Sequence, residues 1–363
     1  MNSTKYLPEY AVWELTLRCN MKCLHCGSSA GSARVNEMSA EECFRVADDL
    51  IELGCHHLTL IGGEIFLYRG WEEVARRLAN GGVKVNIITN ALLMGEEDIA
   101  RIKYAKLTNV GISLDGMEGS HNRIRGSKAS FKKVLAAFEA LRAADMPIAV
   151  VTSLLAFNVA DLEEMYDLLA SYGVDAWQLQ IVTGMGNIAG KHEYLLDPEK
   201  VGQITKFIFE KGRRGSPRVY AGDDLGYFDD YEIYIRSRPG TISAWNGCQA
   251  GMRVVGIDSV GNVKGCESLY ADRFIEGNLR QTSLKEIWTR EGNFAYNRNF
   301  DVSMLGGACA LCDKGSICRG GCRGSSYFSS GSCFESRYCS YPGRPAGSAR
   351  RNRSDATFLN SGT

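Results

Sequence analysis

The chain has 363 residues, of which 45% are hydrophobic and 23% are charged, as is typical of a water-soluble globular protein with one large domain or two ordinary ones. Its 42 Lys and Arg residues balance 42 Asp and Glu residues, so the charge favours neither nucleic acid nor an anionic membrane surface as a partner. No apolar run approaches the roughly 20 residues of a membrane-spanning helix, and the N-terminus carries no apolar signal region. We therefore expect a cytoplasmic protein without a nucleic-acid or membrane partner.

Six short apolar segments, rich in β-branched residues, predict β-strands. They cover residues 11–17, 56–61, 83–89, 107–114, 147–154 and 176–182. Amphipathic helical patterns separate them, the first with a capping box at Ser39 and Glu42. Six such β-α units predict an α/β fold with a parallel sheet, either open and doubly wound or, as we prefer, a partial (β/α)6 TIM-like barrel. In both folds ligands bind beyond the carboxyl ends of the strands.

Composition divides the chain into five predicted segments. These are an N-terminal extension (1–11), the partial barrel (12–212), an irregular bridging region (213–246), a small Cys-rich domain with a β-hairpin and short helices (247–345), and a disordered tail (346–363). In the bridging region acidic and aromatic residues alternate. That segment could grip a basic or extended peptide, or form a solvated loop.

Thirteen cysteines indicate metal or redox chemistry, because cytoplasmic thiols are normally kept reduced. Three lie at positions 19, 23 and 26, directly after the first strand, and eight lie between 248 and 339. Cys43 is expected in the core. Three thiolates suit zinc or an iron-sulfur cluster, but a structural zinc needs a fourth ligand. The only nearby candidate, His25, is one residue from Cys26 and unsuited to the same cage. An iron-sulfur cube, by contrast, can leave one iron open to a non-protein ligand.

The spacing Cys19-x3-Cys23-x2-Cys26 resembles the signature of radical S-adenosylmethionine (SAM) enzymes. The resemblance implies a [4Fe-4S] cluster whose open iron binds SAM, and an external flavodoxin- or ferredoxin-like electron donor. One electron then cleaves SAM to methionine and a 5′-deoxyadenosyl radical, which takes a hydrogen atom from a C–H bond. Segments after later strands resemble the family's SAM-contacting positions: Gly62, Gly63 and Glu64 at the methionine amino group, and Asn90, Ser113, Asp115 and Ser153 around the pocket.

The C-terminal cysteines, in the order C-x12-G-x4-C and then C-x2-C-x5-C-x3-C, resemble the SPASM extension of radical SAM enzymes that act on peptides and proteins. This implies two auxiliary iron-sulfur clusters, expected to be [4Fe-4S], although spacing alone also leaves zinc open. Auxiliary cluster I would use Cys248, Cys266 and Cys322, and auxiliary cluster II Cys309, Cys312, Cys318 and, as its last ligand, Cys339. Cys333 is left over: it completes cluster I, donates a hydrogen atom as a free thiol, or has no role.

Radical SAM enzymes with this extension resemble maturases of ribosomally made peptides (RiPPs), which implies a precursor peptide as substrate and a thioether, C–C or ether crosslink as product. The alternatives are peptide epimerisation, formylglycine formation as in anaerobic sulfatase maturases, and a non-enzymatic zinc- or cluster-stabilised peptide-binding module. Gly27 and Glu267 stand where sulfatase maturases commonly have an aromatic residue and an Asp, which favours the crosslink. Glu267 could be a base for a substrate proton, or an exposed Glu without that role. With about ten residues before the first strand, leader recognition would fall to the barrel surface or a separate leader-binding protein.

Overall fold

The computed structural model describes residues 6–213, 215–238 and 240–345, so the predicted tail and residues 1–5 of the predicted extension lie outside the described residues. The strands are β1 Tyr10–Glu14, β2 His57–Ile61, β3 Lys84–Thr89, β4 Asn109–Ser113, β5 Ile148–Leu154, β6 Ala176–Ile181, β7 Arg218–Ala221, β8 Val254–Ile257, β9 Asn262–Lys264 and β10 Gly277–Asn278. The helices are α1 Ala40–Glu52, α2 Trp71–Asn80, α3 Glu96–Tyr104, α4 Glu118–Arg125, α5 Ser130–Ala143, α6 Leu162–Ser171, α7 Val201–Gly212, α8 Glu232–Arg236, α9 Leu284–Thr289, α10 Ala295–Arg298, α11 Gly315–Cys318 and α12 Arg323–Ser330. All six predicted strands are present.

The first helix shows how local sequence sets an element. The Ser39 side chain accepts a hydrogen bond from the Glu42 backbone N–H, and the Glu42 carboxylate accepts one from the Ser39 N–H at 2.8 Å. This capping box satisfies donors that a helix leaves unpaired at its start. One face of α1 is buried, and the fully buried Cys43 lies on it. The predicted capping box and the core position of Cys43 are therefore confirmed.

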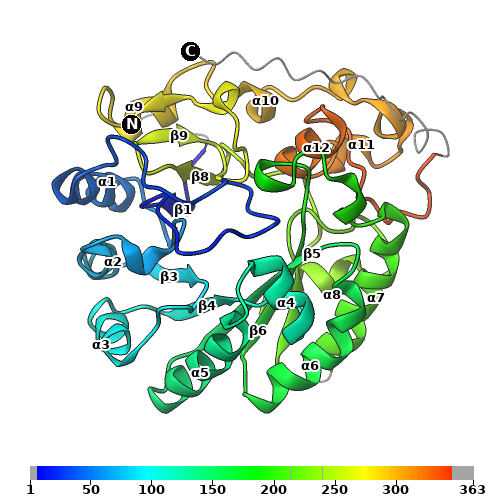
Figure 1. Cartoon of the computed structure of the whole chain (residues 1–363). Coiled ribbons are helices and arrows are strands. Elements are labelled where there is room, and N and C mark those ends of the chain that lie inside the picture. The colour runs from blue at the N-terminus through cyan, green and yellow to red at the C-terminus, as the bar shows by residue number, and fades with distance from the viewer. Residues whose placement is uncertain (1–5, 214, 239, 346–363) are drawn as a thin grey trace.

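Strands β1 to β7 form a parallel sheet in chain order. The sheet curves so that α1, α2, α3, α5, α6 and α7 cover its outer face (Figure 1). The hairpin of β8 and β9 extends the same sheet, because β8 pairs with β1 in parallel and β9 pairs with β8 antiparallel. The predicted α/β class with a parallel sheet and the predicted hairpin are confirmed. No described helix is long and apolar enough to cross a membrane.

The bridging region is more regular than expected. Residues 218–221 form β7, which pairs with β6, and α8 follows it. The solvated-loop interpretation is wrong for Leu225 and Tyr227, which are fully buried, whereas Asp223 and Asp230 are exposed. A four-residue strand carries too little periodicity to be recognised in the sequence, and only its pairing with β6 defines it.

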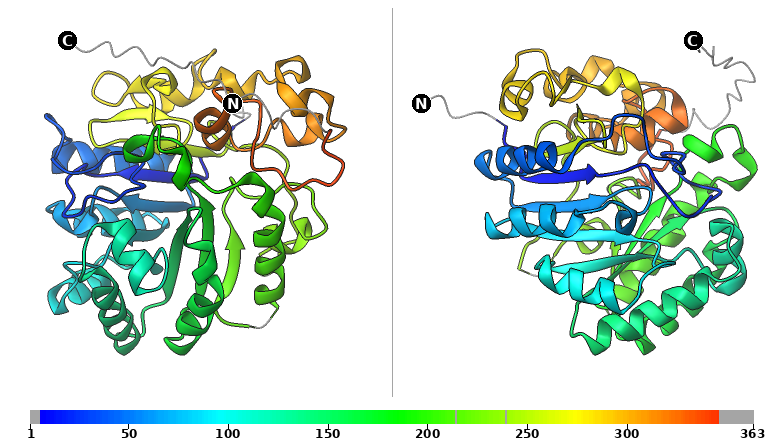
Figure 2. Two further views of the ribbon diagram at one scale, coloured as in Figure 1. Left: turned by 45° about the vertical axis from the view of Figure 1, so that its right-hand side comes forward. Right: turned by 60° about the vertical axis from the view of Figure 1, so that its left-hand side comes forward.

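The C-terminal region reaches both edges of the parallel strands. At one edge, Arg280 of the loop before α9 binds Glu42 of α1, and the Leu284 N–H donates to Asp49. Near the other edge, the Ser340 hydroxyl donates to Asp229 at 2.7 Å. In the views of Figures 1 and 2 the yellow and orange segments run from the β8–β9 hairpin toward α7. The Cys-rich region therefore spans the opening between the two edges of the sheet.

Candidate functional site

Cys19, Cys23 and Cys26 lie on the loop that follows β1, at the carboxyl end of the parallel strands. Backbone contacts fix this loop: the Cys19 N–H donates to the Gly31 carbonyl at 2.9 Å, and Asn187 donates to the carbonyls of Cys23 and Cys26 at 2.9 and 3.0 Å. The three thiols are close enough to interact electrostatically with one another. The structure thus brings the predicted triplet together.

The electrostatics of the triplet fit a positively charged ligand. Burial raises the pKa of Cys19 to about 11. Burial also raises the pKa of Cys23, while the Arg125 guanidinium, whose Nη1 lies 3.8 Å from the Cys23 sulfur, opposes that shift. A cluster binds thiolates, so it would have to displace these protons when it binds, and its irons would supply the missing positive charge. No three His, Cys, Asp or Glu side chains of the described residues are placed to hold a single metal ion. A loop that carries three thiols and no fourth ligand nevertheless fits the larger [4Fe-4S] cluster, which would leave one iron for SAM.

The segment Gly62–Glu64 after β2 runs directly against the loop after β1. The Gly63 N–H donates to the Thr16 carbonyl at 2.7 Å, and a Cβ at Gly63 would lie 2.4 Å from the Arg18 carbonyl oxygen. A Cβ at Gly62 would lie 2.8 Å from the Thr16 carbonyl oxygen. Side chains at these two positions would push the cysteine loop away.

Glu64 and Asn90 connect neighbouring strand ends. The buried Glu64 carboxylate accepts hydrogen bonds from the Thr89 hydroxyl at 2.7 Å and from the Asn90 N–H at 2.8 Å. Burial raises its pKa, and these hydrogen bonds offset part of that shift. The Asn90 amide donates to Asn20 at 2.8 Å, next to Cys19. Glu64 and Asn90 therefore hold the ends of β2 and β3 beside the triplet.

Asp115, directly beyond β4, is the centre of a buried ionic group. Its carboxylate lies 2.7 Å from Arg125 Nε and 3.3 Å from His25 Nε2, and it accepts from the Ser153 N–H at 2.9 Å. Burial opposes ionisation of this carboxyl, but Arg125 and His25 prevail and its pKa is lowered. His25 therefore contacts Asp115. This agrees with the prediction that His25 is unsuited to join the three cysteines as a metal ligand.

Arg125 was not identified from the sequence. It ends α4 and joins Asp115 to Cys23, so it links the strand end to the triplet. The available signal was the pair of basic residues, Arg123 and Arg125, in the last turn of α4, the helix that follows Asp115. Of the remaining predicted residues, the Ser153 hydroxyl accepts from Gln180 at 3.2 Å, and Ser113 is the half-buried last residue of β4.

The buried His121 predicts a specific pH dependence of stability. Its Nδ1 accepts from the Asp115 N–H at 3.0 Å, so its Nε2–H donates to Ser130. Burial, followed by Arg125, lowers its pKa to about 3. The unfolded chain binds this proton below about pH 6.5 and the folded chain does not, so the free energy of unfolding should fall with pH from there toward pH 3, by at most about 1.4 kcal/mol per pH unit.

Replacing His121 with Asn keeps an acceptor for the Asp115 N–H but removes the titration. In anaerobic urea unfolding between pH 7 and pH 5, we expect a shallower slope of unfolding free energy for H121N than for the parent chain. The exposed His192 provides the matched control, and H192N should keep the parent slope. Equal slopes in all three proteins would contradict the assignment.

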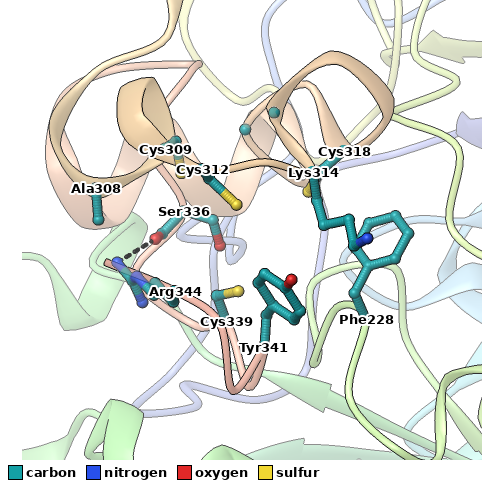
Figure 3. Close-up of a pocket in the computed structure, with 12 residues that line it drawn as sticks. Phe228, Ala308, Cys309, Cys312, Lys314, Cys318, Ser336, Cys339, Tyr341 and Arg344 are labelled. Carbon is teal, nitrogen blue, oxygen red and sulfur yellow. Dashed lines mark hydrogen bonds between the residues drawn. The ribbon is translucent and has the colours of Figure 1, made fainter. Parts of the chain in front are cut away.

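Four cysteines of the C-terminal region line one pocket (Figure 3). They are Cys309, Cys312, Cys318 and Cys339. The pKa of Cys318 is raised to about 12 and that of Cys339 to about 11, mainly by burial and in part by the other thiols of the same pocket. The described residues that line the pocket do not include Cys333. A space surrounded by four sulfurs fits an iron-sulfur cluster with four protein ligands.

A second group of thiols lies deeper in the same region. A hydrogen bond from the Cys322 side chain lowers the pKa of Cys248. Burial raises the pKa of Cys266 to about 11, and Cys248 adds to that shift. The chain therefore brings Cys248, Cys266 and Cys322 together from both ends of the region, around the β8–β9 hairpin and the start of α12.

Glu267 is buried, so the interpretation as an exposed Glu is wrong. One carboxylate oxygen accepts from Lys264 Nζ at 2.8 Å, and the other, Oε2, has no hydrogen-bond partner among the described residues. Burial raises the pKa of Glu267 to about 8, and Lys264 offsets part of this shift. Glu14, at the carboxyl end of β1, acts on it electrostatically. A buried carboxyl with a free oxygen is suited to exchange a proton near neutral pH.

Comparisons with known proteins match both cysteine-bearing regions to known family models. The family model described as the radical SAM superfamily matches residues 13–172, and the model for SPASM, described as an iron-sulfur cluster-binding domain, matches residues 248–318. The mycofactocin maturase MftC of Mycolicibacterium smegmatis is 30% identical over 88% of this chain and 79% of its own length. The AdoMet-dependent heme synthase of Methanosarcina barkeri is 27% identical over 93% of this chain and 98% of its own length.

Among solved structures, Streptococcus suis SuiB bound to the precursor peptide SuiA shares the fold, with a TM-score of 0.73 and 17% identity over 92% of this chain and 75% of that one. The predicted [4Fe-4S] cluster, SAM and auxiliary iron-sulfur clusters are confirmed as cofactors, and the non-enzymatic alternative is wrong. The chain belongs to the radical SAM superfamily and is an enzyme of that superfamily with a C-terminal SPASM domain.

Proposed function

We propose that the enzyme takes a hydrogen atom from a residue of a ribosomally made precursor peptide and installs an intramolecular thioether, C–C or ether crosslink. The observation that carries this proposal is the 30% identity to a mycofactocin maturase across both cysteine-bearing regions. The fold shared with SuiB, solved with its precursor peptide, supports it. This function would require a flavodoxin- or ferredoxin-like electron donor, and leader recognition would fall to the barrel surface or to a separate leader-binding protein.

In this proposal, Cys19, Cys23 and Cys26 hold the cluster that binds SAM. Together the cluster and SAM supply a 5′-deoxyadenosyl radical. The protein's own contribution is positioning: Gly62 and Gly63 allow the strand-end loops to approach closely. The SAM pocket is framed by Glu64, Asn90, Ser113, Asp115 and Ser153, all near the carboxyl ends of β2 to β5.

The two cysteine groups would hold the auxiliary clusters. Cluster I would be held by Cys248, Cys266 and Cys322, and cluster II by Cys309, Cys312, Cys318 and Cys339. The assignment of cluster II is supported by the pocket that its four cysteines line together. The assignment of cluster I is supported by the electrostatic interactions among its three cysteines.

Crosslinking removes two hydrogens from the peptide. One leaves as a hydrogen atom, which the 5′-deoxyadenosyl radical would take up to become 5′-deoxyadenosine, and the other leaves as a proton and an electron, for which an oxidised auxiliary iron-sulfur cluster would be the electron acceptor. We assign the proton to Glu267, whose free oxygen and raised pKa suit it as the acceptor. In E267Q we expect 5′-deoxyadenosine to form still, while the crosslinked peptide falls by about 10²-fold or more. The measurement is the ratio of crosslinked peptide to 5′-deoxyadenosine, determined by mass spectrometry between pH 6.5 and 9.

The matched control is E276Q, because Glu276 is a half-buried acidic residue of the same region whose pKa burial also raises. It should keep the parent ratio. In the parent chain the ratio should rise with pH as Glu267 loses its proton, with a midpoint near its pKa of about 8. A parent-like ratio in E267Q would remove Glu267 from the reaction.

To test the function itself, the chain would be coexpressed with each short open reading frame beside its gene, and the peptide products weighed. Loss of two hydrogens supports a crosslink, and fragmentation locates it. An unchanged mass together with a changed residue configuration indicates epimerisation. Conversion of a Cys or Ser to formylglycine would reject the proposal.

Heme formation is a second candidate, because similarity to the heme synthase extends over 98% of that enzyme's length. The two candidates differ in substrate, so they separate in one assay: the reduced enzyme with SAM is given either the peptide or iron-porphyrin precursors. Heme accumulation without peptide modification would favour this second function.

A further inference from the structure

The eight C-terminal cysteines divide into two groups by their mutual interactions. Cys318 interacts with Cys339, Cys309 and Cys312, the four sulfurs of the shared pocket. In the other group, Cys248 interacts with Cys322 and acts on Cys266. The remaining thiol, Cys333, packs in a buried cluster that includes Cys248, Cys266 and Cys322, and among the described residues it does not line the pocket of the other four cysteines. Cys333 therefore belongs with the group that has only three members.

The local fold holds Cys333 at this position. Helix α12 begins just after Cys322 and ends at Gly331, whose φ of +81° turns the chain back. The Arg323 side chain, from the first residue of α12, donates from Nη1 to the Cys333 carbonyl at 3.0 Å. Cys333 is buried, and burial raises the pKa of its thiol. One short helix and one side chain thus connect Cys333 to Cys322.

Arg323 is an independent sign that an anion belongs here. Its side chain is fully buried and packs against the rings of Phe300 and Phe334. Nε and Nη1 donate to backbone carbonyls, but Nη2 has no hydrogen-bond partner within the described part of the chain. Burial lowers the pKa of Arg323, and the neighbouring Cys248, Cys333 and Cys322 oppose that shift. A buried guanidinium is costly unless negative charge compensates it, and a thiolate-ligated cluster would supply that charge.

We propose that Cys333 is the fourth protein ligand of the cluster held by Cys248, Cys266 and Cys322, with Arg323 as its buried counter-charge. This inference rests on the proposed assignment of that cluster. It makes auxiliary cluster I fully ligated by protein, in contrast to the triplet cluster, where one iron remains for SAM. A cluster closed in this way has no open iron for a substrate and is suited to electron transfer.

The test uses the full chain with the triplet replaced (C19A/C23A/C26A), so that only auxiliary clusters remain. In this background the reduced protein is examined by electron paramagnetic resonance with and without imidazole, a ligand for open iron. A closed cluster predicts an unchanged spectrum in the chain that keeps Cys333. A spectrum that shifts with imidazole would overturn the proposal without any variant at position 333.

Adding C333S, which is close to isosteric, should then create the open iron. We expect an imidazole-dependent spectrum, and an iron content that is either maintained or lower by up to about four atoms per chain, the content of one cluster. The matched control is C55S, because Cys55 is a buried cysteine outside both groups. A C333S chain with full iron and a spectrum that ignores imidazole would overturn the proposal. Neither readout requires SAM cleavage or a peptide, so its failure is distinguishable from failure of the proposed function.

Discussion

Replacing Cys23 with alanine should lower 5′-deoxyadenosine production by more than about 10³-fold, to the uncatalysed background. Cys23 is the middle thiol of the triplet and is buried beside Arg125. Two remaining thiolates cannot hold a cube that already lacks one protein ligand, so the iron content should fall by about four atoms per chain. The measurement is anaerobic iron and sulfide analysis, followed by chromatography of the reaction with SAM and a reductant.

The matched control is C43A, because Cys43 is also a buried cysteine but packs in the core beneath α1. This variant loses packing but should keep its iron and its SAM cleavage. If C23A retains parent-like SAM cleavage, the triplet is not the site of SAM activation. If C43A loses as much iron as C23A, the loss reflects misfolding rather than ligation.

Replacing Arg125 with methionine should lower the free energy of unfolding by about 3–5 kcal/mol, because it leaves Asp115 buried without its cation. Asp115 is fully buried, and Arg125 contributes most to lowering its pKa. A carboxyl with a lowered pKa stabilises the fold above its unfolded pKa of about 3.9, and this stabilisation is lost as the pH falls below that value. Anaerobic denaturant unfolding at pH 7 measures the loss.

Arg123 provides the matched control two residues away on α4, because it is exposed and R123M should cost under about 1 kcal/mol. In the double variant R125M/D115N the unpaired carboxylate is gone. Its destabilisation should therefore be smaller than the sum of the two single effects. Additive effects would show that Arg125 acts through packing and not through the Asp115 charge.

The sequence by itself indicated the parallel α/β class, the six strands from β1 to β6 and, through the spacing of three cysteines, the family of the enzyme. The patterns that carry these predictions are each local to a few residues. The capping box joins Ser39 to Glu42, and the spacing of Cys19, Cys23 and Cys26 is itself a local property of one loop. Local patterns of this kind are visible in a sequence because the residues that interact are also close in the chain.

Only the tertiary structure decided the features that depend on residues far apart in the chain. Strand β8 joins the sheet by pairing with β1, more than 240 residues earlier, and Arg125 reaches Cys23 across 102 residues. The burial of Glu267 and the association of Cys333 with Cys248 likewise follow from packing. Desolvation and long-range electrostatics set these pKa values and pairings, and both depend on the three-dimensional surroundings of a group rather than on its neighbours in the chain.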